Sequence, residues 1–314
     1  MATQHEVPST PRTMHWGAFD ANLAPVIEVD SGDRVTLDCL CGEPSVVPEG
    51  GDFHILPELL EVYREVERPL PGHLMTGPVA VRGAKPGDVL EIRILDVALR
   101  QDWGYSRIRP LGGTLPDDFD VNWLRHIRLD GERMVGITPW GMELPLKPFF
   151  GVLGVAPPEH WGMITSIIPR QHGGNLDLKE LVAGTTLYLP VFNEGALFSA
   201  GDGHAAQGDG EVCSTAIETS LRGTFELHLR TDMALDGPQA ETPSHYITLG
   251  MDVDLDKAAR QALRAMIALI QDKAGITREE AYSLCSLAAD LRVTQLVNLN
   301  KGIHAMLPKS LLGG

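Results

Sequence analysis

The densest cluster of chemically reactive side chains lies in the glycine-rich segment GDGHAAQGDGEVC, residues 201–213. It places four ionisable residues within ten positions: Asp202, His204, Asp209 and Glu211. Aspartate and histidine suit a divalent metal such as Zn²⁺, and glycines let the backbone approach a ligand closely. Glu211 would then be a general base that takes a proton from metal-bound water. A solvated acidic turn has the same composition, so the segment alone leaves both interpretations open.

Three other segments carry side chains that suit a binding site. Asp20 and Asn22 are two positions apart, so in an extended chain they share a face that could bind a cation or an amide. An ordinary Asn/Asp turn is the alternative. His73 begins a short apolar strand between glycines and is either a ligand or a hydrogen-bonded core histidine. Asn175, in the turn HGGNLD of residues 172–177, offers its amide to a substrate.

The cysteines indicate a reduced protein. Cys39 and Cys41 form a C-x-C pair that is too close for an easy disulfide, and no second pair completes a zinc motif. Residues 1–16 lack the basic and apolar segments of a secretory signal, and no window of about 18 apolar residues predicts a transmembrane helix. We therefore expect a cytoplasmic protein with buried, reduced cysteines. Cys213, near Glu211, is an alternative nucleophile.

The elements that must position these residues are mostly β-strands. Between residues 20 and 230, short apolar runs alternate with turns, and residues 89–97 alternate apolar and charged side chains as a half-buried strand does. This spacing predicts a β-sandwich or barrel rather than βαβ units. Residues 100–130 lack the periodicity, and we expect a long loop there that could cover an active site.

The C-terminal quarter has helical periodicity instead. Residues 255–274 place apolar side chains at helical spacing and are followed by Gly275 as a stop. Thr277 begins a capping box for a second helix, and an apolar strand follows at residues 291–297. We therefore predict a mainly β fold, a β-sandwich or barrel body with a C-terminal strand-helix-helix-strand portion. The expected portions are 1–145 (N-terminal, β), 146–235 (central, β, carrying the GDGHAAQGDGE loop) and 236–314 (C-terminal, α/β).

The composition excludes several classes of function. Lys and Arg number 26 against 42 Asp and Glu in 314 residues, which is a formal charge of −16. A chain this acidic is a poor binder of nucleic acid and of anionic membrane surfaces. It contains neither a phosphate-binding loop nor a GxGxxG motif after a strand, so we expect no dinucleotide cofactor.

Taken together, six stretches resemble the acetamidase/formamidase family of metal-dependent amide hydrolases. They are collinear with the family and span nearly the whole chain, whereas residues 100–145 match no family pattern. The stretches are HWGAFDANLAPVIEVDSGD (15–33), GHLMTGPVAVRGAKPGDVL (72–90), PFFGVLGVAP (148–157), GGNLDLKELVAGTTLYLPV (173–191), GALFSAGDGHAAQGDGEVCSTAIE (195–218) and DLRVTQLVNLNKGIHAMLPK (290–309).

The resemblance implies hydrolysis of small linear amides to a carboxylate and ammonia through a metal-activated water. It also implies a divalent metal at the site, with zinc expected and manganese or calcium as alternatives. It assigns roles to eight residues: the metal ligands Asp20, His73, Asp202 and His204, the catalytic carboxylates Glu211 and Asp209, and the substrate-binding amides Asn22 and Asn175.

Two other functions stay open at this point. The chain could hydrolyse another C–N substrate, such as a cyclic imide, a ureide or a larger amide, which pocket size would distinguish. It could also be a non-catalytic β-sandwich module that binds a ligand through a structural metal, which predicts metal binding without turnover. As partners we expect a small-molecule amide substrate and further copies of the chain in a homodimer or higher homo-oligomer. We expect neither nucleic acid nor membrane.

Overall fold

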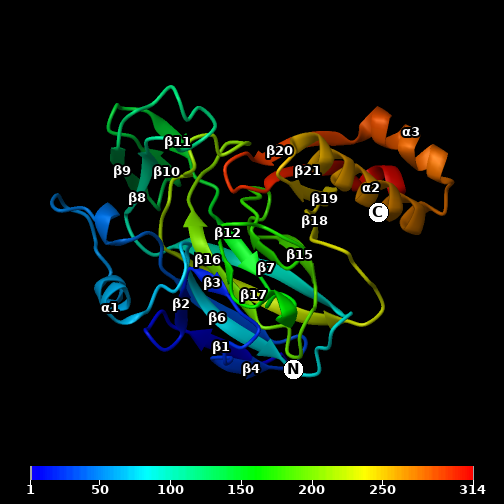
Figure 1. Ribbon diagram of the computed structural model, residues 1–314, viewed down its shortest axis with the longest axis horizontal. Helices are drawn as coiled ribbons and strands as arrows, with labels where there is room; N and C mark the ends of the chain where they lie inside the picture. The colour runs from blue at the N-terminus through cyan, green and yellow to red at the C-terminus, as the bar shows by residue number, and fades with distance from the viewer. Residues whose placement is uncertain (1, 314) are drawn as a thin grey trace.

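Two large sheets form the body of the protein in a computed structural model that describes residues 2–313 (Figure 1). Within these residues, the larger sheet has nine strands in the order β1-β5-β17-β7-β15-β18-β19-β21-β20. In that order the strands are β1 (Gln4–Val7), β5 (Arg34–Cys39), β17 (Leu221–Arg230), β7 (Val89–Leu99), β15 (Thr185–Pro190), β18 (Gln239–Glu241), β19 (His245–Asp252), β21 (Lys301–Pro308) and β20 (Asp290–Gln295).

The second sheet packs against the first and carries the glycine-rich segment. It runs β14 (Gly173–Asn175), β12 (Phe149–Gly154), β16 (Phe198–His204), β6 (Leu74–Val81) and β2 (Met14–Trp16), and β4 (Ile27–Val29) pairs in parallel with β6. The sheets meet in the main hydrophobic core, where the rings of Phe150 on β12 and Phe225 on β17 lie 5.6 Å apart. Buried and less buried side chains alternate along β17, whereas β16 is buried throughout. The predicted mainly β body is confirmed.

A smaller sheet occupies the segment where we expected a long loop. Its strands are β8 (Trp103–Ile108), β9 (Trp123–Asp130), β10 (Val135–Ile137) and β11 (Glu143–Pro145), in the order β11-β10-β9-β8. The loop prediction was therefore wrong for residues 103–108 and 123–130, which form β8 and β9, and the connection between these two strands is a loop. Trp103 and Tyr105 fix β8 by packing against α1 (Pro57–Glu65), a helix that the sequence analysis did not predict.

The C-terminal portion has the predicted helices. In α2 (Leu255–Ala274), the side chain of Asp254 accepts hydrogen bonds from the first-turn amides, and Gly275 ends the helix with a φ of 66°. In α3 (Arg278–Ala288), Thr277 and Glu280 form the expected capping box. Gly250 of β19 lets α2 lie close to the sheet, because a Cβ there would come within 1.9 Å of the Ala258 carbonyl oxygen. The C-terminal α/β prediction is confirmed, with β21 as an additional strand.

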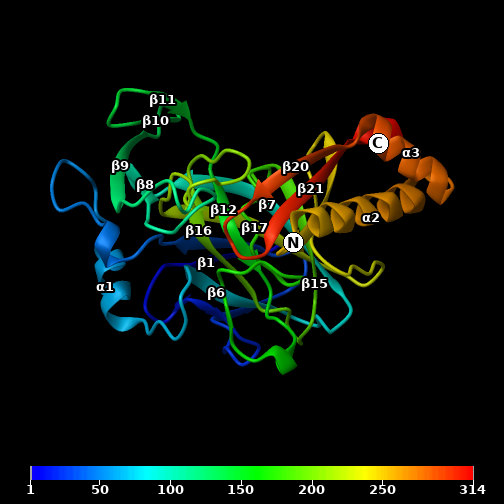
Figure 2. The ribbon, with the colours of Figure 1, turned by 45° about the horizontal axis from the view of Figure 1, so that its top comes forward.

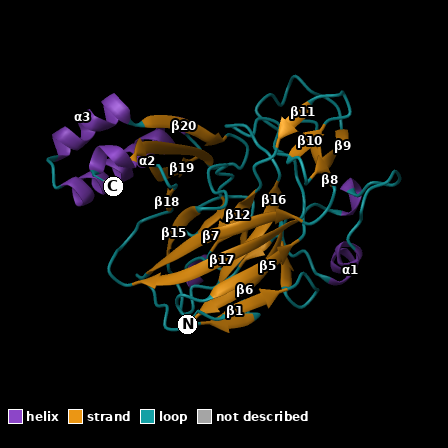
Figure 3. Ribbon diagram, turned by 180° about the vertical axis from the view of Figure 1, so that it is seen from behind, coloured by secondary structure: helices purple, strands orange, loops and turns teal. Residues whose placement is uncertain are grey.

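The C-terminal helices and the β8–β11 sheet lie on opposite sides of the β body. Helices α2 and α3 cover β19–β21 at one end, and the β8–β11 sheet lies at the other (Figures 2 and 3). The nine-stranded sheet takes strands from all three predicted portions, and the boundaries at 145 and 235 stay a prediction. Among the helices that the structure describes, none is both long and apolar enough to span a membrane.

Candidate active site

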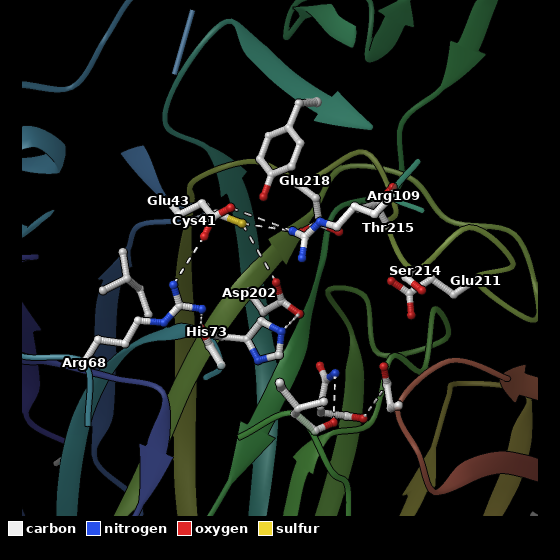
Figure 4. Close-up of a pocket in the computed structure, with 17 residues that line it drawn as sticks. Cys41, Glu43, Arg68, His73, Arg109, Asp202, Glu211, Ser214, Thr215 and Glu218 are labelled. Carbon is white, nitrogen blue, oxygen red and sulfur yellow. Dashed lines mark hydrogen bonds and ion pairs between the residues drawn. The ribbon is translucent and has the colours of Figure 1, made fainter. Parts of the chain in front are cut away.

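A cavity of about 150 Å³ lies where β16 leaves the second sheet (Figure 4). Its walls come from segments far apart in the sequence. Cys41 follows β5, His73 precedes β6, Asp202 belongs to β16, and Glu211 and Glu218 lie in the segment after β16. The β8–β11 region contributes Tyr105 and Arg109, so the part of the chain that matched no family pattern does border the cavity.

His204 is the most enclosed polar side chain of the site. Its Nδ1 lies 2.9 Å from Oε1 of Gln207, and Nε2 of Gln207 donates to the carbonyl oxygen of Asp177 at 2.8 Å. The second bond fixes the orientation of the Gln207 amide, so Nδ1 of His204 must be the hydrogen-bond donor. Nε2 of His204 then faces the carboxylates of Asp202 and Glu218, each at 3.3 Å. Burial opposes protonation of this ring, but Glu218 and Asp202 raise the pKa of His204 well above its usual value.

Asp202 lies between two imidazoles. Its Oδ2 is 3.6 Å from Nε2 of His73 and 3.3 Å from Nε2 of His204. The ring of His73 is held from the other side, because its Nδ1 lies 3.1 Å from the hydroxyl of Ser166. Burial would raise the pKa of Asp202, yet His73 and His204 hold that pKa below its usual range. The carboxylate is therefore ionised and can bind a cation.

Asp177 and Glu211 form a second pair of buried acids beside His204. Their ligand atoms and that of His204 lie within 4.8 Å of one another. One oxygen of Asp177 accepts a hydrogen bond from Nδ2 of Asn298 at 2.5 Å, while in residues 2–313 its other oxygen and Oε2 of Glu211 have no hydrogen-bond partner. Burial, and then the charge of Asp177, raise the pKa of Glu211 well above its usual value. A carboxyl group of this kind can hold a proton for transfer.

Three of these acids sit on strained backbone. The φ angles of Asp177, Asp202 and Glu211 are 49°, 56° and 45°, in the left-handed region that non-glycine residues rarely adopt. Such conformations cost on the order of 1–3 kcal/mol each and cluster at functional sites. Asp177, Asp202 and Glu211 are therefore both buried and strained, and both properties are typical of functional residues.

The residues fit a divalent cation. In the described part of the chain, no lysine or arginine lies within 4 Å of the carboxylates of Asp177, Asp202, Glu211 and Glu218. Gly151 leaves space between two of them, since a Cβ there would come within 2.4 Å of Oδ1 of Asp177 and 2.8 Å of Oδ2 of Asp202. Buried carboxylates require a compensating charge, and carboxylate with imidazole is a donor set that suits zinc or manganese.

The structure gathers five of the eight predicted site residues and leaves three outside. His73, Asn175, Asp202 and Glu211 line the cavity, and His204 contacts Asp202 behind it. Asp20 and Asn22 do not line it, because Oδ1 of Asp20 accepts hydrogen bonds from the backbone and side-chain nitrogens of Asn22 in a local turn. Asp209 points to Lys179, at 3.1 Å from its Nζ. The alternative nucleophile Cys213 does not line the cavity itself, and its thiol contacts Ser106 and the lining residue Thr215.

Sequence reasoning missed three residues of the site. Asp177 and Glu218 lay in the quoted stretches but received no role, and Cys41 was counted as an ordinary buried cysteine. A signal existed for Glu218, which is an acid at the end of the apolar run AIE. Burial, and then Glu218 and Asp202, raise the pKa of the Cys41 thiol well above its usual value.

The mouth of the cavity is cationic. Glu43 pairs with Arg68 at 3.2 Å and with Arg107 at 3.0 Å, and Nη2 of Arg109 lies 3.9 Å from it. Arg68 also lies over the ring of Trp16. The guanidinium groups at the mouth therefore face an interior that carries carboxylates.

Comparison with known proteins identifies a family for this chain. The Acetamidase/Formamidase family matches residues 18–162 and 161–312. The acetamidase of Mycolicibacterium smegmatis is 32% identical over 51% of this chain and 53% of its own length. The structure of a predicted acetamidase/formamidase from Thermoanaerobacter tengcongensis has a TM-score of 0.86 at 27% identity over 100% of this chain and 98% of that one.

An acetamidase structure from Bacillus halodurans has a TM-score of 0.84 at 30% identity, over 98% of both chains. The chain spans about half to three fifths of the length of the curated relatives that it matches, 53%, 61% and 47%. The family match nevertheless extends over nearly all of the chain. The chain belongs to the acetamidase/formamidase family.

Proposed function

We propose that this chain hydrolyses small linear amides, such as formamide and acetamide, to a carboxylate and ammonia with the help of a divalent cation. One observation carries the proposal: the cavity wall holds Asp202 and Glu211, the imidazoles of His73 and His204 lie beside Asp202, and in the described residues no lysine or arginine lies within 4 Å of either acid. Family membership supports the same activity, because matched relatives are named acetamidase and formamidase.

The size of the cavity favours a small substrate. Its volume of about 150 Å³ is half of the roughly 300 Å³ at which pockets for drug-sized ligands begin. Formamide or acetamide fits this space together with a water molecule, whereas a larger amide or a ring would have to extend past Arg109 at the mouth.

We propose that His73, Asp202, His204 and Glu218 hold the cation, with zinc as the metal. Each turns a ring nitrogen or a carboxylate oxygen toward the others, at 3.3–3.6 Å for the contacts that involve Asp202 and His204. When bound, such a cation polarises a carbonyl group and lowers the pKa of water.

Glu211 acts as the acid/base. It takes a proton from the attacking water and returns it to the amide nitrogen as the C–N bond breaks, so that ammonia leaves and the carboxylate remains. Burial raises the pKa of Glu211, which suits a group that holds the proton before donating it to the amide nitrogen. Asn175 holds the substrate, because its Oδ1, which lacks a hydrogen-bond partner among the described residues, can accept a bond from the amide NH₂ group.

The test is ammonia release by metal-loaded protein from formamide, acetamide, a longer linear amide and a cyclic imide. We expect turnover of the two small amides and a loss of roughly 10²–10⁴-fold in Glu211→Gln. Glu194→Gln is the matched control, since Glu194 is exposed and away from the cavity. Wild-type turnover by folded Glu211→Gln would remove the acid/base role.

The same assay separates the two other functions. Turnover of the cyclic imide or the longer amide alone would favour a hydrolase of another C–N substrate. Metal binding without ammonia release from any substrate would favour the non-catalytic module.

We also propose that the chain works in the cytoplasm as a homodimer or higher homo-oligomer, with neither nucleic acid nor membrane as partner. The charge of −16 supports the absence of anionic partners. The cysteines are free, which agrees with a reducing compartment. Exposed apolar side chains such as Leu111 and Leu287 suit contacts between copies. Sedimentation analysis of the purified protein tests the oligomer.

A further inference from the structure

We propose that Cys41 adds a thiolate ligand to the proposed cation site, next to Asp202 and Glu218, so that the site takes a borderline-soft metal. The inference rests on the proposed metal-dependent function and specifies its cofactor, because a sulfur donor selects zinc, cobalt or cadmium over calcium and magnesium. None of the sequence patterns assigned Cys41 a role.

The thiol of Cys41 points into the cavity between two carboxylates (Figure 4). Its Sγ lies 3.5 Å from Oε2 of Glu218 and 3.9 Å from Oδ1 of Asp202, and the three ligand atoms are all within 4.8 Å of one another. These separations are those of atoms that share one cation at zinc–ligand distances of about 2.0–2.3 Å.

The backbone holds Cys41 in this position. Its amide donates to the hydroxyl of Ser220 at 3.3 Å, and its carbonyl oxygen accepts from the hydroxyl of Tyr63 at 3.1 Å. Gly42 follows with a φ of 92°, a backbone conformation that glycine adopts without a steric penalty. Cys41 itself is 5% exposed, so its position does not depend on a mobile surface loop.

An independent observation points to a cation at the same place. Nε2 of His204 is fully buried, has no hydrogen-bond partner within residues 2–313, and faces Asp202 and Glu218. The bond from Nδ1 to Gln207 orients the ring so that Nε2 is the nitrogen that faces the two carboxylates and is available to a cation there. Glu218 uses its other oxygen for the amide of Ala216 at 3.0 Å, so Oε2 alone remains for the site. The thiol of Cys41 and the ring of His204 thus approach the same two carboxylates, and together they supply the sulfur, nitrogen and oxygen donors that zinc takes.

The test exchanges the bound metal of the full chain for Co²⁺ and records its absorption. A thiolate ligand gives cobalt a near-ultraviolet charge-transfer band, whereas oxygen and nitrogen donors do not. We expect this band to saturate at one Co²⁺ per chain in the wild type and to be lost in Cys41→Ser. Cys213→Ser is the matched control, because Cys213 lies outside the cavity lining, and it should keep the full band.

The wild-type spectrum tests the inference without any variant, since cobalt bound without the band overturns it even if Cys41→Ser does not fold. Cys41→Asp is a second variant that keeps an anionic ligand and should bind cobalt without the band. A band that survives Cys41→Ser, or that Cys213→Ser removes, also overturns the assignment.

Failure of this inference differs from failure of the proposed function. Ammonia release by cobalt-loaded protein without the band would refute the thiolate ligand and leave amide hydrolysis standing. The band without ammonia release from any amide would support the ligand and refute the hydrolase. If the wild type binds no cobalt, the metal site and the ligand fail together.

Discussion

Nδ2 of Asn298 donates a 2.5 Å hydrogen bond to Oδ2 of Asp177, across 121 positions of the chain. The same amide nitrogen lies 3.3 Å from the carbonyl oxygen of Asn175. The segment between β20 and β21 therefore orients an acid of the cavity, and the C-terminal portion is part of the site rather than an appendage.

Asn298→Ala should destabilise the fold and impair the site. A hydrogen bond to a charged group contributes about 1.5–3 kcal/mol, so the free energy of unfolding should fall by about that amount, and ammonia release should fall with it. Asn300→Ala is the control, because Asn300 donates to the carbonyl oxygen of Pro169 away from the acids. Urea unfolding together with the amidase assay checks this. Equal activity losses in the two variants would contradict an orienting role for Asn298.

Gln207→Leu should weaken metal binding by about 10–100-fold, the usual effect of removing the hydrogen-bond acceptor behind a ligating histidine. Without Oε1 of Gln207, 2.9 Å from Nδ1 of His204, the ring loses both its orientation and its fixed tautomer. Gln207→Glu keeps the acceptor for Nδ1 but loses the donor to the carbonyl oxygen of Asp177, so it should bind metal more tightly than Gln207→Leu and less tightly than the wild type. Zinc competition against a chelator measures the affinity, and an unchanged value in Gln207→Leu would show that Gln207 does not orient the ring.

Gly151→Ala should abolish most activity while the chain still folds. The added methyl group would come within 2.4 Å of Oδ1 of Asp177 and must displace the cavity acids. A shift of about 1 Å at reacting groups can cost roughly 10²-fold in rate. Gly131→Ala is the control, because its Cβ would meet only the side chain of Leu99, at 3.8 Å. Near-normal kcat in Gly151→Ala would mean that this space is not used.

Glu180 should make the protein acid-sensitive. Burial would raise its pKa, but His304 and Lys179 lower the pKa of Glu180 from 4.5 to about 2. Because the folded pKa is depressed, the stabilisation is present above pH 4.5 and is lost as the pH falls toward 2. At ~1.4 kcal/mol for each pH unit, this amounts to about 3 kcal/mol.

Glu180→Gln removes this dependence. The variant should unfold more easily than the wild type at pH 7, and the difference should shrink at pH 3. Urea midpoints at both pH values measure it. A difference that stays constant with pH would show that the carboxylate does not titrate across this window.

Local sequence patterns predicted elements that local chemistry determines. The capping box of α3 and the apolar spacing of α2 are complete within their own residues. Strand β8 was not predictable in this way, because it is fixed by packing of Trp103 and Tyr105 against α1. The same holds for α1 itself, a short helix whose buried face becomes apparent only when β8 lies against it.

The same distinction between local and long-range contacts explains which site residues were predicted. Asp202, His204 and Glu211 were found because one glycine-rich segment carries them all. Cys41 contacts Asp202 although the two residues are 161 positions apart. A local sequence pattern cannot predict a contact between residues so far apart in the chain. Asp20 and Asn22 were predicted as site residues and are not. The spacing of two positions fits both a strand face that binds an amide and a local turn, and the structure has the turn, in which Asp20 accepts hydrogen bonds from Asn22.

The left-handed backbone at Asp177, Asp202 and Glu211 sets thermostability against activity. Glycine, and to a lesser extent asparagine, relieves such a conformation, and neutral residues there would also remove repulsion among buried acids. Directed evolution of this protein for heat resistance alone should therefore enrich substitutions at these three positions, and each survivor would be a more robust but inert protein. A thermostability screen needs a parallel selection for amide turnover to keep the site intact.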